Sequence, residues 1–482
     1  MVLILKTSTR FLLVIFTYIV FIFVSFPLVA QDRESYYNFS DVDYSQARVI
    51  PDELNTELKV KAAFNDQYMF FQFNWPAEEG IYHDYLTFQD GKWVAHGGSA
   101  YGPREDGFYE DRLSFLVDKG NVKDFETLGC YVTCHEGLRF TSTMATEEEI
   151  ADVPLLADKA DIRKYINETR SSPHWSKIKS EEELSKLREL GIFLDFWHWR
   201  AHRSDPIGYS DDQWVLEYRN SDGGKGPYTT NWNSDNEQPA YMFDPDIVGF
   251  TALDWDDVSN HRLTQDDYFY ISEDIAVEFD PELDWQEGDV IPRRLLRTPD
   301  ESRATITSNS KWEDGQWSLE LKRLLDTGYP EDDIALVPGQ NYNIGYAVHK
   351  NASGSRWHYI SSRKTLGLGI DADVTAIRFD GETPNWDQIE ATTIPLYYPG
   401  QVSWEFLTSK YHPGQGGILD GTNCLSCHSE EYLGKSSVSH ETKDGSYPTF
   451  IATTVGGSVL ILGIILGPLY FMSRKGGRRN GK

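Results

Sequence analysis

The sequence predicts a mainly β fold, an antiparallel β-sandwich with helical insertions, followed by a short C-terminal segment and one membrane-spanning helix. Short runs rich in aromatic and β-branched residues recur between residues 58 and 361, as strands do. Turn-forming clusters such as Asn220-Ser221-Asp222-Gly223-Gly224 separate some of these runs. Helical patterns are few, and aromatic residues make up 14% of the chain, which suits a β-rich core. This balance is typical of a β-sandwich.

The individual elements follow from local patterns. Asn65-Asp66-Gln67 separates two strand-like runs and predicts a hairpin. Ser180 and Glu183 form a capping-box pattern, which marks the start of a helix. We expect strands at 58–64, 68–75, 112–117, 192–202, 213–218, 317–321, 342–349 and 357–361, and helices at 146–152, 161–168 and 180–190.

Two long apolar stretches mark the ends of the chain. Residues 11–30 are almost wholly apolar and follow Lys6 and Arg10, which predicts an export signal or, alternatively, an uncleaved N-terminal anchor. Residues 450–472 carry no charge and are long enough to cross a bilayer. Because a basic tail follows, the positive-inside rule places that tail in the cytoplasm and the body outside the plasma membrane.

The expected organisation therefore has five parts. They are a signal peptide or anchor at 1–30, a β-sandwich domain at 31–395, a haem segment at 396–448, a transmembrane helix at 449–473 and a basic cytoplasmic tail at 474–482. The formal net charge of −30 disfavours nucleic acid as a partner, because phosphates need Lys and Arg. It favours a partner protein with a basic docking surface.

The most specific motif lies near the C-terminus. In Cys424-Leu425-Ser426-Cys427-His428, two cysteines two residues apart are followed at once by a histidine, which is the attachment pattern of c-type haem. The thiols of Cys424 and Cys427 would add to the porphyrin vinyl groups, and His428 would bind the iron. A redox dithiol would not need the histidine, and no further ligands for a zinc site follow.

A second motif has one more residue between its cysteines, Cys130-Tyr131-Val132-Thr133-Cys134-His135. The alternative is a local disulfide beside an incidental histidine. All four cysteines of the chain fall in these two pairs, however, and each pair ends in Cys-His. We therefore expect two covalent haem c groups, with His135 as an iron ligand of the first. No cysteine then remains for an iron–sulfur cluster.

The second axial ligand of the first haem is open. A strand over 192–202 would place His198, Arg200 and His202 on one face, with Trp197 and Trp199 on the other. We expect this face to border the first haem and one of the two histidines to bind its iron. An ordinary hydrogen-bonded histidine is the alternative for each. Rival ligands are Met144, His349 and His358, and the candidates for the second haem are His412, His440 or an open position.

Five blocks of sequence carry a family resemblance, namely residues 113–118, 129–135, 197–204, 346–349 and 356–359. They resemble the haem-binding domain of the ethylbenzene dehydrogenase-related cytochromes over residues 41–392. The resemblance implies a β-sandwich that holds one haem. Some members are γ subunits of molybdenum enzymes of the dimethyl-sulfoxide-reductase class, and others are free-standing or membrane-bound cytochromes. The γ subunits hold haem b through Met and Lys, so their ligands do not transfer to a chain with Cys130 and Cys134.

Together these features predict a membrane-anchored dihaem c-type cytochrome that transfers electrons on the periplasmic side. It would act as a subunit or redox partner of a respiratory oxidoreductase. The alternatives are a haem enzyme with an open iron site and a carbohydrate-binding module, which the haem motifs disfavour. No catalytic residue is assigned, because the sequence contains no phosphate loop, GxSxG elbow or HExxH helix.

Overall fold

The structure is a computed structural model that describes residues 55–96, 108–133, 135, 145–159, 162, 164–172, 174–350 and 358–397. The leader, Cys134, the motif at Cys424, Cys427 and His428, and the expected span at 450–472 lie outside the described residues. Within the described ranges, no helix combines the length and the apolar character that crossing a membrane requires.

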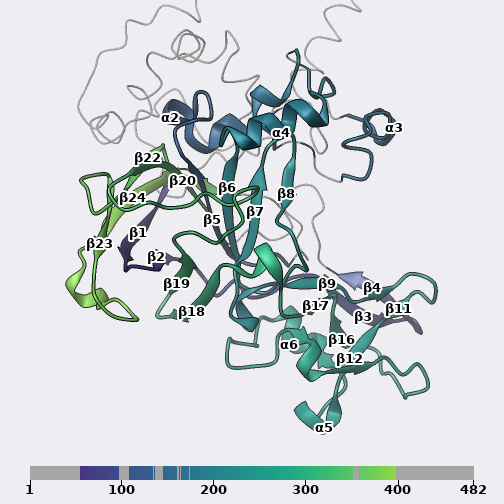
Figure 1. Cartoon of the computed structure of the whole chain (residues 1–482). Coiled ribbons are helices and arrows are strands. Elements are labelled where there is room, and N and C mark those ends of the chain that lie inside the picture. Colours follow the sequence, from purple (N-terminus) through teal and green to yellow (C-terminus); the bar gives the residue numbers. More distant parts are fainter. Residues whose placement is uncertain are drawn as a thin grey trace, which may run out of the picture. The chain divides into compact units, whose positions relative to one another are not determined.

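A mixed sheet of 13 strands dominates the fold (Figure 1). Its main path runs β18-β19-β2-β1-β23-β22-β20-β5-β6-β7-β8, and β21 and β24 link β20 back to β1. Most pairs are antiparallel, whereas β23 runs parallel to both β1 and β22. Its strands are β1 (Asn55–Phe64), β2 (Tyr68–Pro76), β5 (Arg112–Asp118), β6 (Leu194–Arg200), β7 (Asp211–Val215), β8 (Arg219–Ser221), β18 (Thr307–Glu313), β19 (Gln316–Leu324), β20 (Asn341–His349), β21 (Tyr359–Ile360), β22 (Lys364–Leu368), β23 (Val374–Arg378) and β24 (Thr392–Tyr397).

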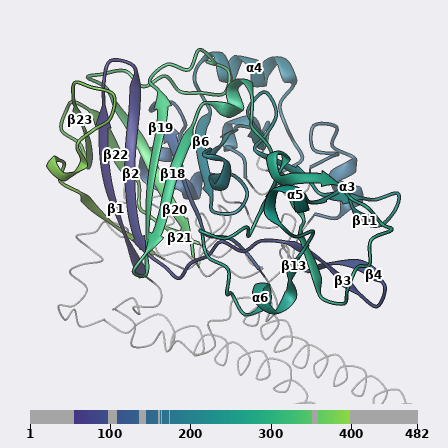
Figure 2. The same cartoon turned by 90° about the horizontal axis from the view of Figure 1, so that it is seen from below.

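An aromatic core holds two arms of this sheet face to face. Figure 2 shows β18, β19, β2 and β1 side by side in one arm. The ring of Phe71 on β2 lies 5.3 Å from that of Phe115 on β5 and 5.7 Å from that of Trp197 on β6, measured between centroids. Phe73 similarly lies 6.1 Å from Tyr346 on β20. The mainly β, antiparallel prediction is therefore confirmed.

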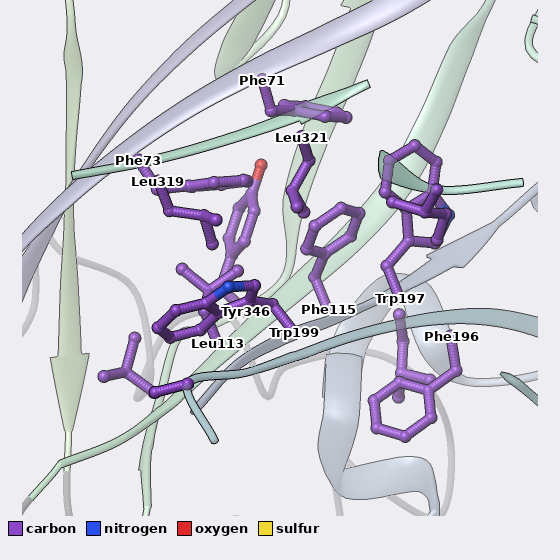
Figure 3. Packing of buried hydrophobic residues seen from close by; sticks show 14 of the residues in the cluster. Phe71, Phe73, Leu113, Phe115, Phe196, Trp197, Trp199, Leu319, Leu321 and Tyr346 are labelled. Carbon is purple, nitrogen blue, oxygen red and sulfur yellow. The ribbon is translucent and has the colours of Figure 1, made fainter. Parts of the chain in front are cut away.

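Strands β5 and β6 are buried along their whole length, unlike β19, in which buried and more exposed residues alternate. Successive side chains of a strand point to opposite faces. Trp197 enters the aromatic core, and Figure 3 shows Phe196 pointing away from it. Both faces of β5 and β6 are therefore covered, one by the aromatic core and the other by a separate set of side chains described below.

Smaller sheets and short helices complete the described part. The sheets are β13-β16-β3-β4, β14-β17-β9, β10-β11 and β12-β15. Their strands are β3 (Tyr85–Gln89), β4 (Lys92–His96), β9 (Tyr228–Thr230), β10 (Trp232–Asn233), β11 (Gln238–Pro239), β12 (Tyr241–Phe243), β13 (Leu253–Asp254), β14 (Ile271–Ser272), β15 (Ala276–Glu278), β16 (Asp289–Pro292) and β17 (Arg294–Leu296). The helices are α2 (Phe125–Leu128), α3 (Glu147–Ala151), α4 (Glu181–Glu189), α5 (Pro245–Val248) and α6 (Trp255–Ser259), with 3₁₀ turns η2 (Gly129–Thr133), η3 (Asn167–Thr169), η4 (Asp205–Ile207), η5 (Glu273–Ile275), η6 (Glu301–Ala304) and η7 (Trp386–Gln388).

Two of the three predicted helices are present. The capping box of Ser180 and Glu183 begins α4, and α3 occupies the predicted 146–152 region. The helix predicted at 161–168 is wrong where the structure describes this range. Ile166 is extended, and its N–H bonds to the carbonyl of Leu216 at 2.9 Å instead of to its own preceding turn.

Candidate functional site

Strands β20, β5 and β6 present two rows of side chains on the face opposite the aromatic core. The register places residues of the three strands directly across from one another, so side chains in one row share a face. These rows line one pocket. They consist of His349, Arg112 and Arg200, and of Ala347, Ser114 and His198.

Basic side chains dominate the charged lining of this pocket. Asp84 is the one acidic side chain of the described residues that contributes to it. The pocket therefore has the electrostatic character of a site for a negatively charged group. Its basic lining comes from Arg112, Lys164, Arg200, Arg203, Arg219 and Arg294.

Three of these cations already have a carboxylate partner. Arg200 pairs with Asp211 and Arg203 with Glu110, in both cases through buried acids. Arg294 Nη2 lies 3.3 Å from Asp84 Oδ2. Their charges are thus largely balanced inside the protein, and these three arginines shape the pocket wall more than they attract a ligand.

Arg112 differs from these three arginines. Arg112 is only 5% exposed, and its Nε and Nη2 atoms have no hydrogen-bond partner. No acid of the described part forms an ion pair with it, and its guanidinium lies 4.3 Å from the ring centroid of Tyr109. Burial lowers the pKa of Arg112 to about 10, so the side chain still carries its charge at neutral pH. A buried cation with idle N–H groups is costly unless an anion satisfies it.

His198 offers the pocket an imidazole nitrogen without a partner. Its Nδ1 lies 3.1 Å from Oε1 of Gln213 and 3.0 Å from Nη2 of Arg200, whereas its Nε2 is buried and unbonded. Burial holds the pKa of His198 well below its usual value, so the ring is neutral. When Nδ1–H donates to Gln213, the lone pair of Nε2 is free to bind a metal.

His349 and His358 form a second imidazole group in the pocket. Their rings stack with centroids 4.7 Å apart, and Nδ1 of His349 is buried without a hydrogen-bond partner. Burial, and then the neighbouring charge of Arg112, holds the pKa of His349 well below its usual value. Both histidines line the pocket, so two of the three rival ligands predicted from the sequence lie in the same place as His198, and the third, Met144, lies outside the described residues.

Cys130 reaches the pocket because β20 has a glycine beside it. Cys130 belongs to η2, the turn that follows α2. A Cβ atom placed on Gly345 would lie 2.7 Å from the Cys130 sulfur and 3.2 Å from its backbone nitrogen. Only glycine therefore lets this turn pack so closely on the strand. The sulfur then lies in the pocket that His198 and His349 also line.

His135 occupies a separate environment. Its Nε2 lies 3.0 Å from the carbonyl oxygen of Tyr165, and its ring stacks on that of Tyr165 with centroids 3.6 Å apart. Burial lowers the pKa of His135 to about 3. His135 does not line the pocket. Its neighbour in sequence, Cys134, lies outside the described residues. The role of His135 as an iron ligand stays a prediction.

The structure separates His202 from His198. Strand β6 ends at Arg200, so the predicted strand to residue 202 was too long and its alternation does not reach His202. The backbone N–H groups of His202 and Arg203 bond to the Glu110 carboxylate, which turns the chain. The ring of His202 then places Nδ1 2.9 Å from the Ile81 carbonyl, and it does not line the pocket.

Sequence reasoning placed Arg200 on the face that carries His198, but it missed the other basic residues of the pocket. Arg112 and Ser114 occupy alternate positions of a strand, and Leu113 and Phe115 between and beside them enter the apolar core. That alternation was a usable signal for a polar face. Lys164, Arg219 and Arg294 reach the pocket from distant segments, so no local pattern marks them.

Comparison with known families agrees with this arrangement. The family model described as ethylbenzene dehydrogenase matches residues 24–361, well over half of the chain. The chain belongs to the ethylbenzene dehydrogenase family. The resemblance expected from the sequence blocks is therefore confirmed.

A curated relative adds a second observation. The chain is 29% identical to cytochrome c-552 of Stutzerimonas stutzeri over 92 residues, which are 19% of this chain and 30% of that protein. The match thus spans under a third of the relative's length. Together with the family, it indicates an electron-transfer or redox-related protein.

Proposed function

We propose that this member of the ethylbenzene dehydrogenase family is a c-type cytochrome whose pocket holds a haem and carries electrons. The observation that supports this most directly is the donor set of the pocket. A cysteine sulfur, neutral imidazoles with unbonded nitrogens and an unpaired buried arginine line the same pocket. These are the groups that attach a porphyrin, bind its iron and pair with its carboxylates.

Each group has a proposed role in holding the haem. Cys130, with Cys134, would form the thioether links, and His198 would bind iron through Nε2. Arg112 would pair with a propionate, because it lines the pocket and two of its nitrogens have no hydrogen-bond partner. The bound haem would supply a reversible one-electron change at its iron, while the buried neutral histidines keep the coordination and the protonation state fixed.

His135 remains the proposed second iron ligand of this haem. Because Cys134 directly precedes His135 in the sequence, a haem attached to Cys134 would be held close to His135. Its Nε2 faces the Tyr165 carbonyl, whereas its Nδ1 is buried without a hydrogen-bond partner, so only ligation through Nε2 would require the ring to leave that contact. His349 is the alternative, because its Nδ1 already lies unbonded in the pocket lining.

The rest of the proposal extends beyond the described residues. Cys424, Cys427 and His428 would hold a second haem c, and residues 450–472 would anchor the chain in the plasma membrane with its main domain on the periplasmic side. The chain would pass electrons as a subunit or redox partner of a respiratory oxidoreductase, such as a molybdenum enzyme of the dimethyl-sulfoxide-reductase class. Its acidic surface would favour a basic partner.

Mass spectrometry and optical spectra test this function. The mature protein should show two haem additions that survive denaturation, and one of them should be lost with Cys130→Ala and the other with Cys424→Ala. Both haems should be low-spin and six-coordinate. The matched control Ser426→Ala, inside the second motif, should retain both haems. A high-spin haem that binds carbon monoxide would contradict electron transfer and favour an enzyme, and no covalent haem would contradict the cytochrome itself.

A further inference from the structure

A second polar cluster lies outside the pocket and consists of buried carboxylates. Asp195, Asp212 and Asp333 form one group, and Asp222, Asp332 and Asp333 form another. Within each group the nearest carboxylate oxygens all lie within 4.8 Å of one another. The described residues thus place four acids around one shared carboxylate, that of Asp333, which makes five in all.

The first group has its own cation. Arg323 Nη1 lies 2.8 Å from Oδ2 of Asp195, 3.0 Å from Oδ1 of Asp333 and 4.0 Å from Oδ2 of Asp212. The Arg323 side chain is fully buried. Because its guanidinium supplies positive charge at this end of the cluster, no further cation is needed there. One guanidinium carries a single positive charge, however, and cannot balance five carboxylates.

The second group has no such partner. Asp222 is only 3% exposed, and neither of its carboxylate oxygens has a hydrogen-bond partner. The Oδ2 atom of Asp333 is likewise buried and unbonded. No lysine or arginine of the described part forms an ion pair with Asp222 or Asp332. Three acceptor atoms are therefore buried and unsatisfied where their carboxylates meet.

A proton alone does not resolve this arrangement. Burial, followed by the neighbouring carboxylates of Asp333 and Asp332, raises the pKa of Asp222 to about 10, which reflects the shortage of positive charge around it. One proton on Asp222 could be donated to only one neighbouring carboxylate oxygen, and the other Asp222 oxygen would remain buried without a partner. A cation would instead satisfy both Asp222 oxygens and Oδ2 of Asp333 together.

We propose that Asp222, Asp332 and Asp333 bind one calcium ion. The donor set consists of carboxylate oxygens, which select a hard cation over zinc or copper. Calcium accepts six to eight oxygens in flexible geometry, whereas magnesium requires a near-ideal octahedron. Asp332 is already oriented, because Ser302 Oγ donates to its Oδ1 at 3.0 Å and the Gly223 N–H to its Oδ2 at 3.2 Å.

The ion would join two segments that are distant in sequence. Asp222 follows the end of β8, and Asp332 and Asp333 belong to the connection between β19 and β20. Because Asp333 also bonds to Arg323 on β19, the calcium site would share a ligand with the ion pair that reaches Asp195 on β6. Calcium would thus stabilise the contact between the two arms of the main sheet without touching the haem pocket.

Calorimetric titration of the purified full chain, after treatment with EGTA, tests the proposal. We expect one Ca²⁺ per chain, at least tenfold weaker binding of Mg²⁺, and at least tenfold weaker Ca²⁺ binding in Asp222→Asn. Asp256→Asn is the matched control, since Asp256 belongs to an exposed acid pair with Arg262. Its Ca²⁺ affinity should equal that of the wild type.

Two outcomes would overturn the calcium site. One is a wild-type chain that binds no Ca²⁺ after chelation, which would mean that protons neutralise the cluster. The other is unchanged affinity in Asp222→Asn. If that variant does not fold, Asp332→Asn decides instead, because its carboxylate is nearer the surface and a wild-type affinity there would equally refute the site. Haem content should be the same in every folded variant.

Discussion

Arg112 on β5 and His349 on β20 lie directly opposite each other in the antiparallel register, and both present unbonded nitrogen atoms in the lining of the same pocket. The two residues are far apart in sequence, so strand pairing alone brings them together. A buried guanidinium beside a buried imidazole is unfavourable in the protein by itself. Under the proposed function, a bound haem would satisfy both residues, because a propionate would pair with Arg112 and the iron could accept a nitrogen of His349.

Replacing Arg112 by Met should therefore have opposite effects with and without haem. Without haem, the variant should be more stable by about 1 kcal/mol, because the removal of two unsatisfied buried N–H groups outweighs the loss of the cation–π contact with Tyr109. With haem, it should be less stable than the wild type, because a propionate loses its partner. Denaturant unfolding of both forms measures the two signs.

Arg378→Met is the control for Arg112→Met, since Arg378 forms an exposed ion pair with Asp66. Exposed pairs contribute little, so both forms of this variant should stay within about 0.5 kcal/mol of the wild type. A loss of stability in haem-free Arg112→Met would show that Arg112 serves the fold and not a ligand.

Gly345→Ala should disturb the Cys130 turn. The added methyl group would meet the Cys130 sulfur at 2.7 Å, so η2 must move away from β20. We expect a loss of about 1–3 kcal/mol in the free energy of unfolding and incomplete haem attachment at the first motif. A double-mutant cycle with Cys130→Ala, made in haem-free protein, separates the contact from other effects. The cost of Gly345→Ala should fall in the Cys130→Ala background, and an unchanged cost would show that the two residues do not interact.

The sequence predicted some of this site and missed the rest for physical reasons. The Cys130 turn and the strand face with His198 follow from a motif and from period-two alternation, and the structure brings both to one pocket. His202 was misplaced because the end of β6 depends on Glu110, a residue from another segment.

Long-range pairing explains the other omissions. Arg112 begins a predicted strand, but nothing in the sequence marks it as part of a site, because its isolation from acids depends on tertiary packing. Asp222 belonged to a predicted turn, and its meeting with Asp333 depends on how the β19–β20 connection packs. Strands β22, β23 and β24 were not predicted, although together with β1, β20 and β21 they complete the return path of the main sheet.

The different positions of His198 and His202 lead to a spectroscopic prediction. His198→Ala should convert one haem from low-spin to high-spin, because it removes the imidazole whose unbonded Nε2 lies in the pocket lining. His202→Ala should leave both haems low-spin, since that ring does not line the pocket. Electron paramagnetic resonance of the oxidised protein measures the spin states. A low-spin His198→Ala together with a high-spin His349→Ala would assign the ligand to β20 instead of β6.

His202 should instead affect stability as a function of pH. Its pKa is lowered from 6.5 to about 4, chiefly by burial, so the folded protein favours the neutral ring more than the unfolded chain does. The resulting stabilisation is complete above pH 6.5 and is lost as the pH falls toward 4, where the unfolded chain binds the extra proton. This single group would contribute roughly 3 kcal/mol over that range.

The matched test of this pH dependence compares haem-free wild type with His202→Gln from pH 7.5 to pH 4.5 by denaturant unfolding. Glutamine keeps a polar side chain near the Ile81 carbonyl but cannot take up a proton in this range. The fall in stability between pH 6.5 and 4.5 should be smaller in His202→Gln than in the wild type. His174→Gln, at an exposed histidine, should follow the wild-type curve. Parallel curves for the wild type and His202→Gln would mean that His202 is protonated equally easily in the folded and unfolded chain, and that the Ile81 contact does not hold a neutral ring.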